Sequence, residues 1–178
     1  EVIAPAHGLC WRINPTTIVE KYVKWATGTP EQTAVIIFDT IWGGSEKMAR
    51  AIAEGLEEQG ISYRMYNAGA SDMADVMTDI LTTRAVVLGC PTLNNGILPP
   101  MALYLEELRG LRFKNKIGAT FGTYGWSGEA VKRLEAGLQE AGIEVVVPGY
   151  KCQFSPGNDD LEKCRELGRE LGAKIKAS

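Results

Sequence analysis

Two hydroxyl side chains and two glycines lie in the segment Asp39–Lys47, between a buried apolar run and a helical pattern. Backbone N–H groups at the start of a helix bind anions, and Thr40 and Ser45 can add hydroxyl donors. The turn has no lysine, and it matches neither GxxxxGK[ST] nor GxGxxG, which argues against a triphosphate site with magnesium and against a dinucleotide fingerprint. The segment favours one terminal phosphate held by neutral donors. A plain strand-to-helix turn is the alternative.

A second polar segment, Gly89–Pro100, is long for a loop between a strand and a helix. Asn94 and Asn95 offer side-chain donors and acceptors, and Asn95-Gly96 is a turn dipeptide that tolerates a positive φ. An idle surface loop is the alternative interpretation. Apolar Leu93 argues that the loop covers something, because surface loops are otherwise mostly polar.

The third segment, Gly122–Gly128, combines glycines with Tyr124 and Trp126. An aromatic face can stack on a planar ligand ring. Each tryptophan, Trp42 included, could instead pack beneath its own loop. A phosphate cradle, a polar turn and an aromatic wall together fit a flat heteroaromatic ring with a phosphate tail, which describes FMN better than a nucleoside triphosphate.

These three segments follow strands in a regular alternation of apolar runs and helical patterns. Strands are predicted at 34–38, 61–66, 85–89, 116–121 and 143–147, and helices at 45–59, 72–82 and from about 99, 127 and 158, with Ser127 as the cap of the helix that starts near 127. Alternating elements predict an α/β fold: a doubly wound five-stranded parallel sheet, order 2-1-3-4-5, with helices on both faces. Ligands of such sheets bind at the carboxyl ends of the strands. A receiver-type signalling domain shares this topology, but its phosphorylated Asp is missing where strand 3 ends in Cys90-Pro91-Thr92.

Composition narrows the class of function. Among 178 residues, 45% are hydrophobic and the net charge is −3, which argues against disorder and against nucleic acid as the main partner. No apolar run approaches a membrane span, and no secretory signal pattern is present. Four cysteines without a CxxC pair suit a reducing cytoplasm, and Cys90, Cys152 and Cys164 are predicted to be buried structural thiols, with a redox role as the alternative. We therefore expect a cytoplasmic protein without a membrane partner.

Residues 1–30 differ from the regular pattern that follows. Ile18, Tyr22 and Trp25 recur at helical spacing after Pro15, and Gly28-Thr29-Pro30 ends that helix. The chain starts with Glu1 rather than Met, so we expect it to begin within a longer protein.

Several strings in the same order make the chain resemble the flavodoxin-like domain of flavodiiron proteins, also called A-type flavoproteins. They are Pro5-Ala6-His7-Gly8, Trp11-Arg12, Phe38-Asp39-Thr40-Ile41-Trp42-Gly43, Ser45-Glu46-Lys47-Met48-Ala49, Pro91-Thr92-Leu93-Asn94-Asn95-Gly96 and Tyr124-Gly125-Trp126-Ser127-Gly128. The resemblance implies a flavodoxin-like fold and noncovalently bound FMN. By matching motif, it implies a phosphate site at Thr40, Ile41, Trp42, Gly43 and Ser45. The ribityl chain and ring edge would lie against Pro91, Thr92, Leu93, Asn94, Asn95 and Gly96, and the other side of the ring against Thr123, Tyr124, Gly125, Trp126 and Gly128.

The resemblance also implies a larger parent protein. Residues 1–30 would be the linker after a missing metallo-β-lactamase-like diiron domain, and residues 31–178 the FMN-binding domain. His7 matches an iron ligand of that missing domain, but no other histidine accompanies it, so we assign no metal to this chain. Family members reduce dioxygen to water or nitric oxide to nitrous oxide. Electrons would arrive from a rubredoxin-like or NADH-linked donor and pass to the diiron site, in a parent that is a homodimer or homotetramer.

No residue of the chain has the surroundings of an acid–base catalyst or a nucleophile, so the sequence predicts an electron carrier rather than an enzyme in its own right. A self-contained FMN-dependent NAD(P)H:quinone-type reductase is the alternative, and a binding module without flavin is a third hypothesis. Gly44 departs from the hydroxyl residue found near this position in many relatives. We expect that departure to remove one phosphate donor.

Overall fold

The computed structural model describes residues 2–177 of the chain. In that range the elements are α1 (Thr16–Thr27), β1 (Glu31–Phe38), α2 (Gly44–Glu58), β2 (Ser62–Asn67), α3 (Met73–Thr82), β3 (Thr83–Gly89), α4 (Pro99–Leu111), β4 (Ile117–Tyr124), α5 (Ala130–Glu140), β5 (Glu144–Val145), β6 (Tyr150–Gln153) and α6 (Asn158–Lys176). The predicted strands and helices are present, with ends that differ by a few residues.

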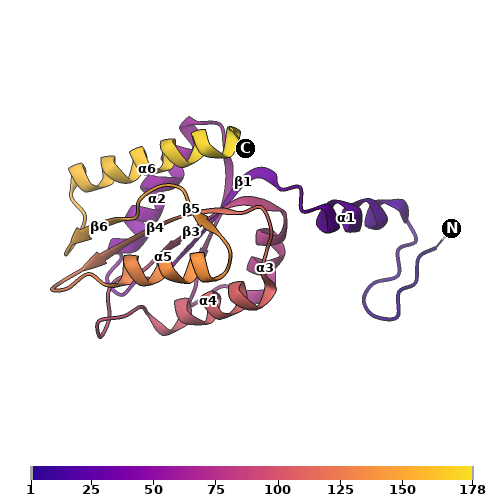
Figure 1. Cartoon of the computed structure of the whole chain (residues 1–178), viewed down its shortest axis with the longest axis horizontal. Helices are drawn as coiled ribbons and strands as arrows, with labels where there is room; N and C mark the ends of the chain where they lie inside the picture. The colour runs from indigo at the N-terminus through magenta and orange to yellow at the C-terminus, as the bar shows by residue number, and fades with distance from the viewer. Residues whose placement is uncertain (1, 178) are drawn as a thin grey trace.

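The strands form a parallel sheet in the order β2-β1-β3-β4-β5, which confirms the predicted topology. β1 lies between β2 and β3, so the chain changes direction across the sheet at that point. The carboxyl ends of β1, β3 and β4 therefore meet at one edge of the sheet (Figure 1). Loops after neighbouring strands on either side of such a reversal leave a crevice between them.

The fifth strand is broken, where the sequence predicted one strand at 143–147. β5 pairs with the start of β4 and β6 with its end, and between Val145 and Tyr150 the chain takes two residues more than β4 does between Gly118 and Phe121. Pro148 has no N–H to donate to a ladder, so it cannot continue regular pairing. The Glu135 carboxylate accepts the Gly149 N–H at 2.9 Å and stabilises the displaced backbone.

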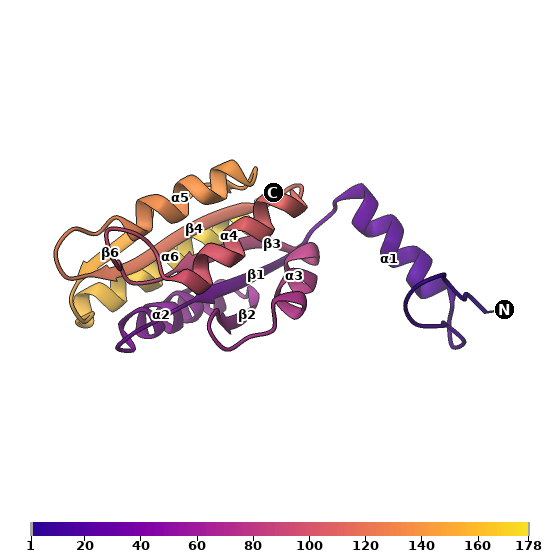
Figure 2. The same ribbon diagram turned by 90° about the horizontal axis from the view of Figure 1, so that it is seen from below.

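Helices cover both faces of the sheet (Figures 1 and 2). Alternate residues of β1 enter two separate clusters: Ile36 and Phe38 pack with α2 and α6, whereas Val35 and Ile37 pack with α3, α4 and α5. Because both faces are buried, the strands read as unbroken apolar runs. The side chains of the sheet interior are thus committed to packing.

α2 and α6 approach each other closely on one face. A Cβ at Gly55 would overlap the carbonyl oxygen of Arg165, so only glycine allows this distance. Ion pairs join the same helices across the contact, from Arg165 to Glu54 at 2.7 Å and from Arg169 to Glu58 at 2.9 Å. The C-terminal part of α2 is therefore fixed against α6.

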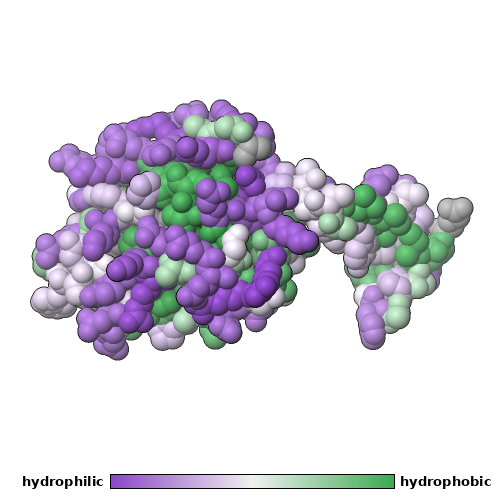
Figure 3. Space-filling view, viewed as in Figure 1, coloured by the Kyte–Doolittle hydropathy of each residue, from purple (hydrophilic) through white to green (hydrophobic). Residues whose placement is uncertain are grey.

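The N-terminal segment stands away from the sheet, and α1 joins it through the chain before β1 (Figure 2). The Asn115 side chain donates to the Gly28 carbonyl at 2.7 Å at that joint. Hydrophobic residues lie at the surface of the segment (Figure 3). Leu9 and Tyr22 are among the exposed large side chains there. His7 is also exposed there. Within residues 2–177, no helix is both long enough and apolar enough to cross a membrane.

Lys116 is buried at the amino ends of the strands, 6% exposed. Its ammonium group donates to the carbonyl of Leu81 at 3.1 Å and to that of Thr83. Burial, with a smaller contribution from the positive charge of Arg84, lowers the pKa of Lys116 to about 8. This face of the molecule thus holds a cation that is costly at neutral pH.

Substituting Gly55 by Ala should destabilise the fold by about 2–4 kcal/mol, because α2 must move off α6 to admit the methyl group. Gly110→Ala is the matched control. A Cβ at this exposed position of α4 meets nothing within 4 Å, so the change should stabilise by about 0.5–1 kcal/mol through helix propensity. Urea unfolding measures both. Equal free energies of unfolding for the two variants would contradict the close-approach argument.

The stability contribution of Lys116 should depend on pH. Its pKa is lowered in the folded chain, so between about pH 8 and its usual pKa the unfolded chain binds more protons, and stability rises with pH. In Lys116→Met this rise is absent. The free energy of unfolding of the parent minus that of the variant should therefore increase from about pH 7 to about pH 10. A difference that stays flat or falls would contradict it.

Candidate functional site

The three loops at the carboxyl edge of the sheet surround a cavity of about 460 Å³. Its lining comes from the ends of β1, β3, β4 and β6, far apart in sequence. The lining residues are Thr40, Ile41, Trp42, Gly44, Pro91, Thr92, Leu93, Thr123, Tyr124, Gly125, Trp126, Phe154 and Ser155. None of them carries a formal charge, so a ligand here would meet neutral polar and aromatic groups.

The first wall is the turn from β1 into α2. Gly43 has φ of 77°, a left-handed conformation that glycine adopts without strain, and its N–H donates to the Thr40 hydroxyl at 2.9 Å. The helix begins at Gly44, and no side chain caps it. The first N–H groups of α2 therefore keep their hydrogen-bonding capacity for an anion at the helix N-terminus.

Gly44 has a packing reason that the sequence did not reveal. A Cβ there would lie 3.1 Å from the Cγ2 of Thr123 and 3.5 Å from the Cδ of Pro156. A larger residue would push β4 and the chain before α6 away from the turn. Glycine at this position thus allows the first and third loops to lie close together.

Ser45 lies in the first turn of α2 with no exposed surface, and its hydroxyl has no hydrogen-bond partner among the described residues. A buried hydroxyl without a partner loses the free energy of its bonds to water. The sequence predicts Ser45 in a phosphate site, and the residue lies in the first turn of α2, next to Gly44 of the cavity lining.

The two tryptophans are not packed beneath their loops. Trp42 is 92% exposed and Trp126 is 95% exposed, and both belong to the cavity lining. Exposed indole rings on loops are rarely explained by packing in the same chain. Their faces remain available to a planar ligand.

The middle loop folds as a tight turn. Leu93 and Gly96 exchange backbone hydrogen bonds of 3.2 and 2.8 Å, and Asn94 and Asn95 have φ of 48° and 55°. Positive φ at both central residues is tolerated by asparagine. The turn leaves Asn94, Asn95 and Gly96 outside the cavity lining, although the sequence included them in the site.

Thr92 links this loop to α5, which corrects a sequence prediction. Ser127 was expected to cap that helix, but the helix begins at Ala130, whose N–H donates to the Thr92 hydroxyl at 3.2 Å. The Ser127 hydroxyl instead lies against Glu129 and, at 3.3 Å, Asn95. A cap from another loop has no local sequence pattern, so the prediction chose the nearest serine.

Phe154 and Ser155 also line the cavity, although the sequence does not predict them as site residues. The break in the fifth strand brings them to the edge of the sheet, and Phe154 has φ of 62°, unusual for an aromatic residue. Its N–H donates to the Tyr124 carbonyl at 2.7 Å. The sequence directly before Phe154 contains no residues typical of a turn, so its position at the cavity follows only from the break in the fifth strand.

Gly43, Ser45 and Gly128 are the remaining predicted site residues that lie outside the lining itself. Each is close to it in sequence: Gly43 and Ser45 flank Gly44, and Gly128 lies two residues after Trp126. The structure thus brings together the turn after β1, the residues directly after β3 and the loop after β4, and leaves Asn94, Asn95 and Gly96 at the margin.

Three cysteine thiols are buried, which keeps them protonated and unreactive. Cys90 lies directly after β3 and is fully buried, which raises the pKa of its thiol to about 12. Cys152 and Cys164 are also buried free thiols, in agreement with the sequence. Within residues 2–177, no group of three His, Cys, Asp or Glu side chains is arranged to hold a metal ion.

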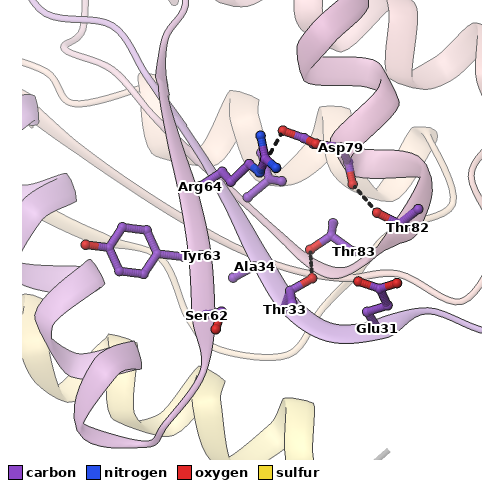
Figure 4. A pocket seen from close by; sticks show the side chains of 10 residues that line it. Glu31, Thr33, Ala34, Ser62, Tyr63, Arg64, Asp79, Thr82 and Thr83 are labelled. Atoms are coloured by element: carbon purple, nitrogen blue, oxygen red, sulfur yellow. Dashed lines mark hydrogen bonds and ion pairs between the residues drawn. The ribbon is translucent and has the colours of Figure 1, made fainter.

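A second cavity, of about 250 Å³, lies at the opposite end of the sheet, near the amino ends of β1 and β3 (Figure 4). Its main polar groups are paired with one another or with neighbours. Thr33 and Thr83 share a hydrogen bond of 3.0 Å, and Arg64 pairs with Asp79 at 3.4 Å. It offers few free groups to a ligand.

The chain is similar in sequence and in fold to known proteins that contain a flavodoxin-like part. The family model described as Flavodoxin matches residues 36–168. The chain is 46% identical over 176 residues to the nitric oxide reductase of Moorella thermoacetica, covering 98% of this chain and 44% of that protein. Its structure resembles the rubredoxin oxygen:oxidoreductase of Desulfovibrio gigas, with a TM-score of 0.92 and 36% identity over 99% of this chain and 44% of that one. The flavodiiron protein of Giardia intestinalis gives a TM-score of 0.87 and 27% identity, again over 99% of this chain and 44% of that one. The chain thus spans less than half the length of these relatives.

Replacing Thr92 by Val should lower the free energy of unfolding by about 0.5–2 kcal/mol without added ligand, because Ala130 loses its capping acceptor. Thr92→Ser keeps the hydroxyl and serves as the control. Urea denaturation of both variants tests the cap. If valine and serine give the same stability, the Ala130 contact contributes nothing.

Proposed function

We propose that this chain, which belongs to the flavodoxin family and corresponds to the flavodoxin-like part of flavodiiron proteins, binds FMN and carries electrons within a larger oxygen or nitric oxide reductase. The sheet edge has the features that such a ligand needs. A phosphate binds at a helix N-terminus, and a planar ring binds between aromatic side chains.

One observation carries the proposal. An uncapped helix N-terminus with an unpartnered buried hydroxyl at Ser45 lies beside a cavity flanked by two almost fully exposed tryptophans. Neither feature is explained by packing within residues 2–177. A phosphate at one end and a flat apolar ring at the other explain both.

In this proposal the hydroxyls of Thr40 and Ser45 and the first N–H groups of α2 hold the phosphate, Gly43 forms the turn that places them, and Trp42 and Trp126 hold the ring. Pro91 and Thr92 lie between them, against the chain that joins ring and phosphate. Bound FMN supplies the chemistry, since it takes up and releases one or two electrons. The residues of this chain bind it, exclude water from one part of the ring and set its surroundings.

The relatives suggest the wider setting. The chain matches 44% of the Moorella, Desulfovibrio and Giardia proteins, so we propose a parent with a diiron domain, to which residues 1–30 form the linker. A rubredoxin-like or NADH-linked donor would supply the electrons. Three buried free thiols suit a cytoplasmic location.

The visible absorption spectrum of the purified chain, before and after adding FMN, tests the binding. A flavin spectrum with quenched flavin fluorescence is the expected result, because the ring stacks on indole. A colourless chain that leaves added FMN fluorescent would overturn the proposal. Sustained NADH oxidation with a quinone by this chain alone would instead favour the self-contained reductase.

Ser45→Ala should weaken FMN binding about tenfold, the loss of roughly one hydrogen bond to a charged acceptor. Without ligand the variant should be as stable as the parent or slightly more stable, because an unpartnered buried hydroxyl is removed. Riboflavin has no phosphate and is the control ligand, whose affinity should not change. Fluorescence titration measures the two affinities, and urea unfolding measures the stability without ligand. If Ser45→Ala weakens riboflavin binding as much as FMN binding, Ser45 does not contact the phosphate.

A further inference from the structure

β6, the second piece of the broken fifth strand, has one side in the core and one toward the site. Cys152 is buried against Met48, with 3.8 Å between the sulfur atoms. Since side chains alternate along a strand, Lys151 and Gln153 lie on the opposite face, toward the loop that follows β4. We define that loop, Tyr124–Gly128, as the aromatic loop.

Three hydrogen bonds join this part of the chain to the aromatic loop. Lys151 Nζ donates to the Gly128 carbonyl at 3.2 Å, and Gln153 Nε2 donates to the Gly125 carbonyl at 2.9 Å. The N–H of Phe154 donates to the Tyr124 carbonyl at 2.7 Å. Both ends of the loop are therefore fixed by β6 and the residue after it.

Lys151 makes a second contact with the loop. Its ammonium nitrogen lies 5.2 Å from the centre of the Tyr124 ring, within the range of a cation–π interaction. A Cβ at Gly128 would lie 2.9 Å from that nitrogen, so the ammonium group is seated closely against the backbone. One side chain thus bridges the first and last residues of the loop.

Elsewhere in the loop, the Ser127 hydroxyl lies against Glu129 and, at 3.3 Å, Asn95. Trp126 at its centre is 95% exposed, and the loop contains glycine on both sides of the Trp126–Ser127 pair. Glycine-rich backbone loses much conformational entropy when it is ordered. Ordering the loop before a ligand arrives removes that cost from binding.

We propose that Lys151 is a positioning residue for the ring of the ligand: it holds the aromatic loop in the conformation that presents Tyr124 and Trp126 to the cavity. The inference rests on the proposed function, since the ring is that of FMN. Lys151 does not belong to the cavity lining, so its effect passes through the loop. It should therefore act on the ring and leave the phosphate end unaffected.

The test compares Lys151→Met and Lys151→Arg in the chain by titration with FMN and with riboflavin, followed by flavin fluorescence. Lys163→Met is the matched control. The ammonium nitrogen of Lys163, a residue of α6, lies 5.6 Å from the centre of the Tyr150 ring, which is a similar contact outside the aromatic loop. Lys151 is exposed, and thermal unfolding without ligand verifies that each variant folds like the parent.

The methionine variant should bind both ligands about tenfold more weakly, from the loss of a cation–π contact and a charged hydrogen bond. Equal weakening for the two ligands identifies an effect on the ring. Arginine keeps the charge and the donors and should restore most of the affinity, and Lys163→Met should bind like the parent.

Two results overturn the inference in distinguishable ways. Suppose that the parent binds FMN. If Lys151→Met then binds both ligands as tightly as the parent does, or if it loses affinity for FMN alone, Lys151 does not position the ring and the proposed function stands. If the parent binds neither ligand, the proposed function fails and the inference fails with it.

Discussion

The burial of the sheet on both faces constrains everything else in this molecule. β1, β3 and β4 lie between two layers of helices, so most of their buried side chains are apolar and are occupied by packing. Polar and aromatic groups with free hydrogen-bonding capacity or free faces can gather only where the strands end. The reversal of direction at β1 then opens a space between the loops at one edge. The site is thus a consequence of the same packing that stabilises the fold.

α2 connects that packing to the site. Gly55 allows it to lie directly on α6, and ion pairs to Glu54 and Glu58 hold the two helices in register. Its other end begins at Gly44, where contact with Thr123 sets the distance between the first and third loops. A rigid helix fixed at one end positions the N–H groups at its other end without the help of charged side chains. This arrangement suits a site lined by neutral residues.

Much of this could be predicted from the sequence, because the apolar runs are long and each is followed by a turn of special composition. The strand order, the two-sided core and the three loops follow from that pattern and agree with the structure. Pro148 marks the place where regular pairing of the fifth strand stops, but the displaced backbone after it could not be predicted, since the carboxylate of Glu135 from α5 replaces a strand partner there. The Thr92 cap and the contribution of Phe154 were missed for the same reason: each is a contact between distant segments. The residues assigned to FMN remain predictions.

The break has a further consequence for how the molecule can vary. Among the described residues, β6 pairs with β4 alone, and the segment from Val146 to Gly149 separates it from β5. Insertions or deletions in that segment would shift the residues next to the aromatic loop while the register of β1, β3 and β4 stays unchanged. One rim of the cavity can therefore diverge among relatives independently of the core.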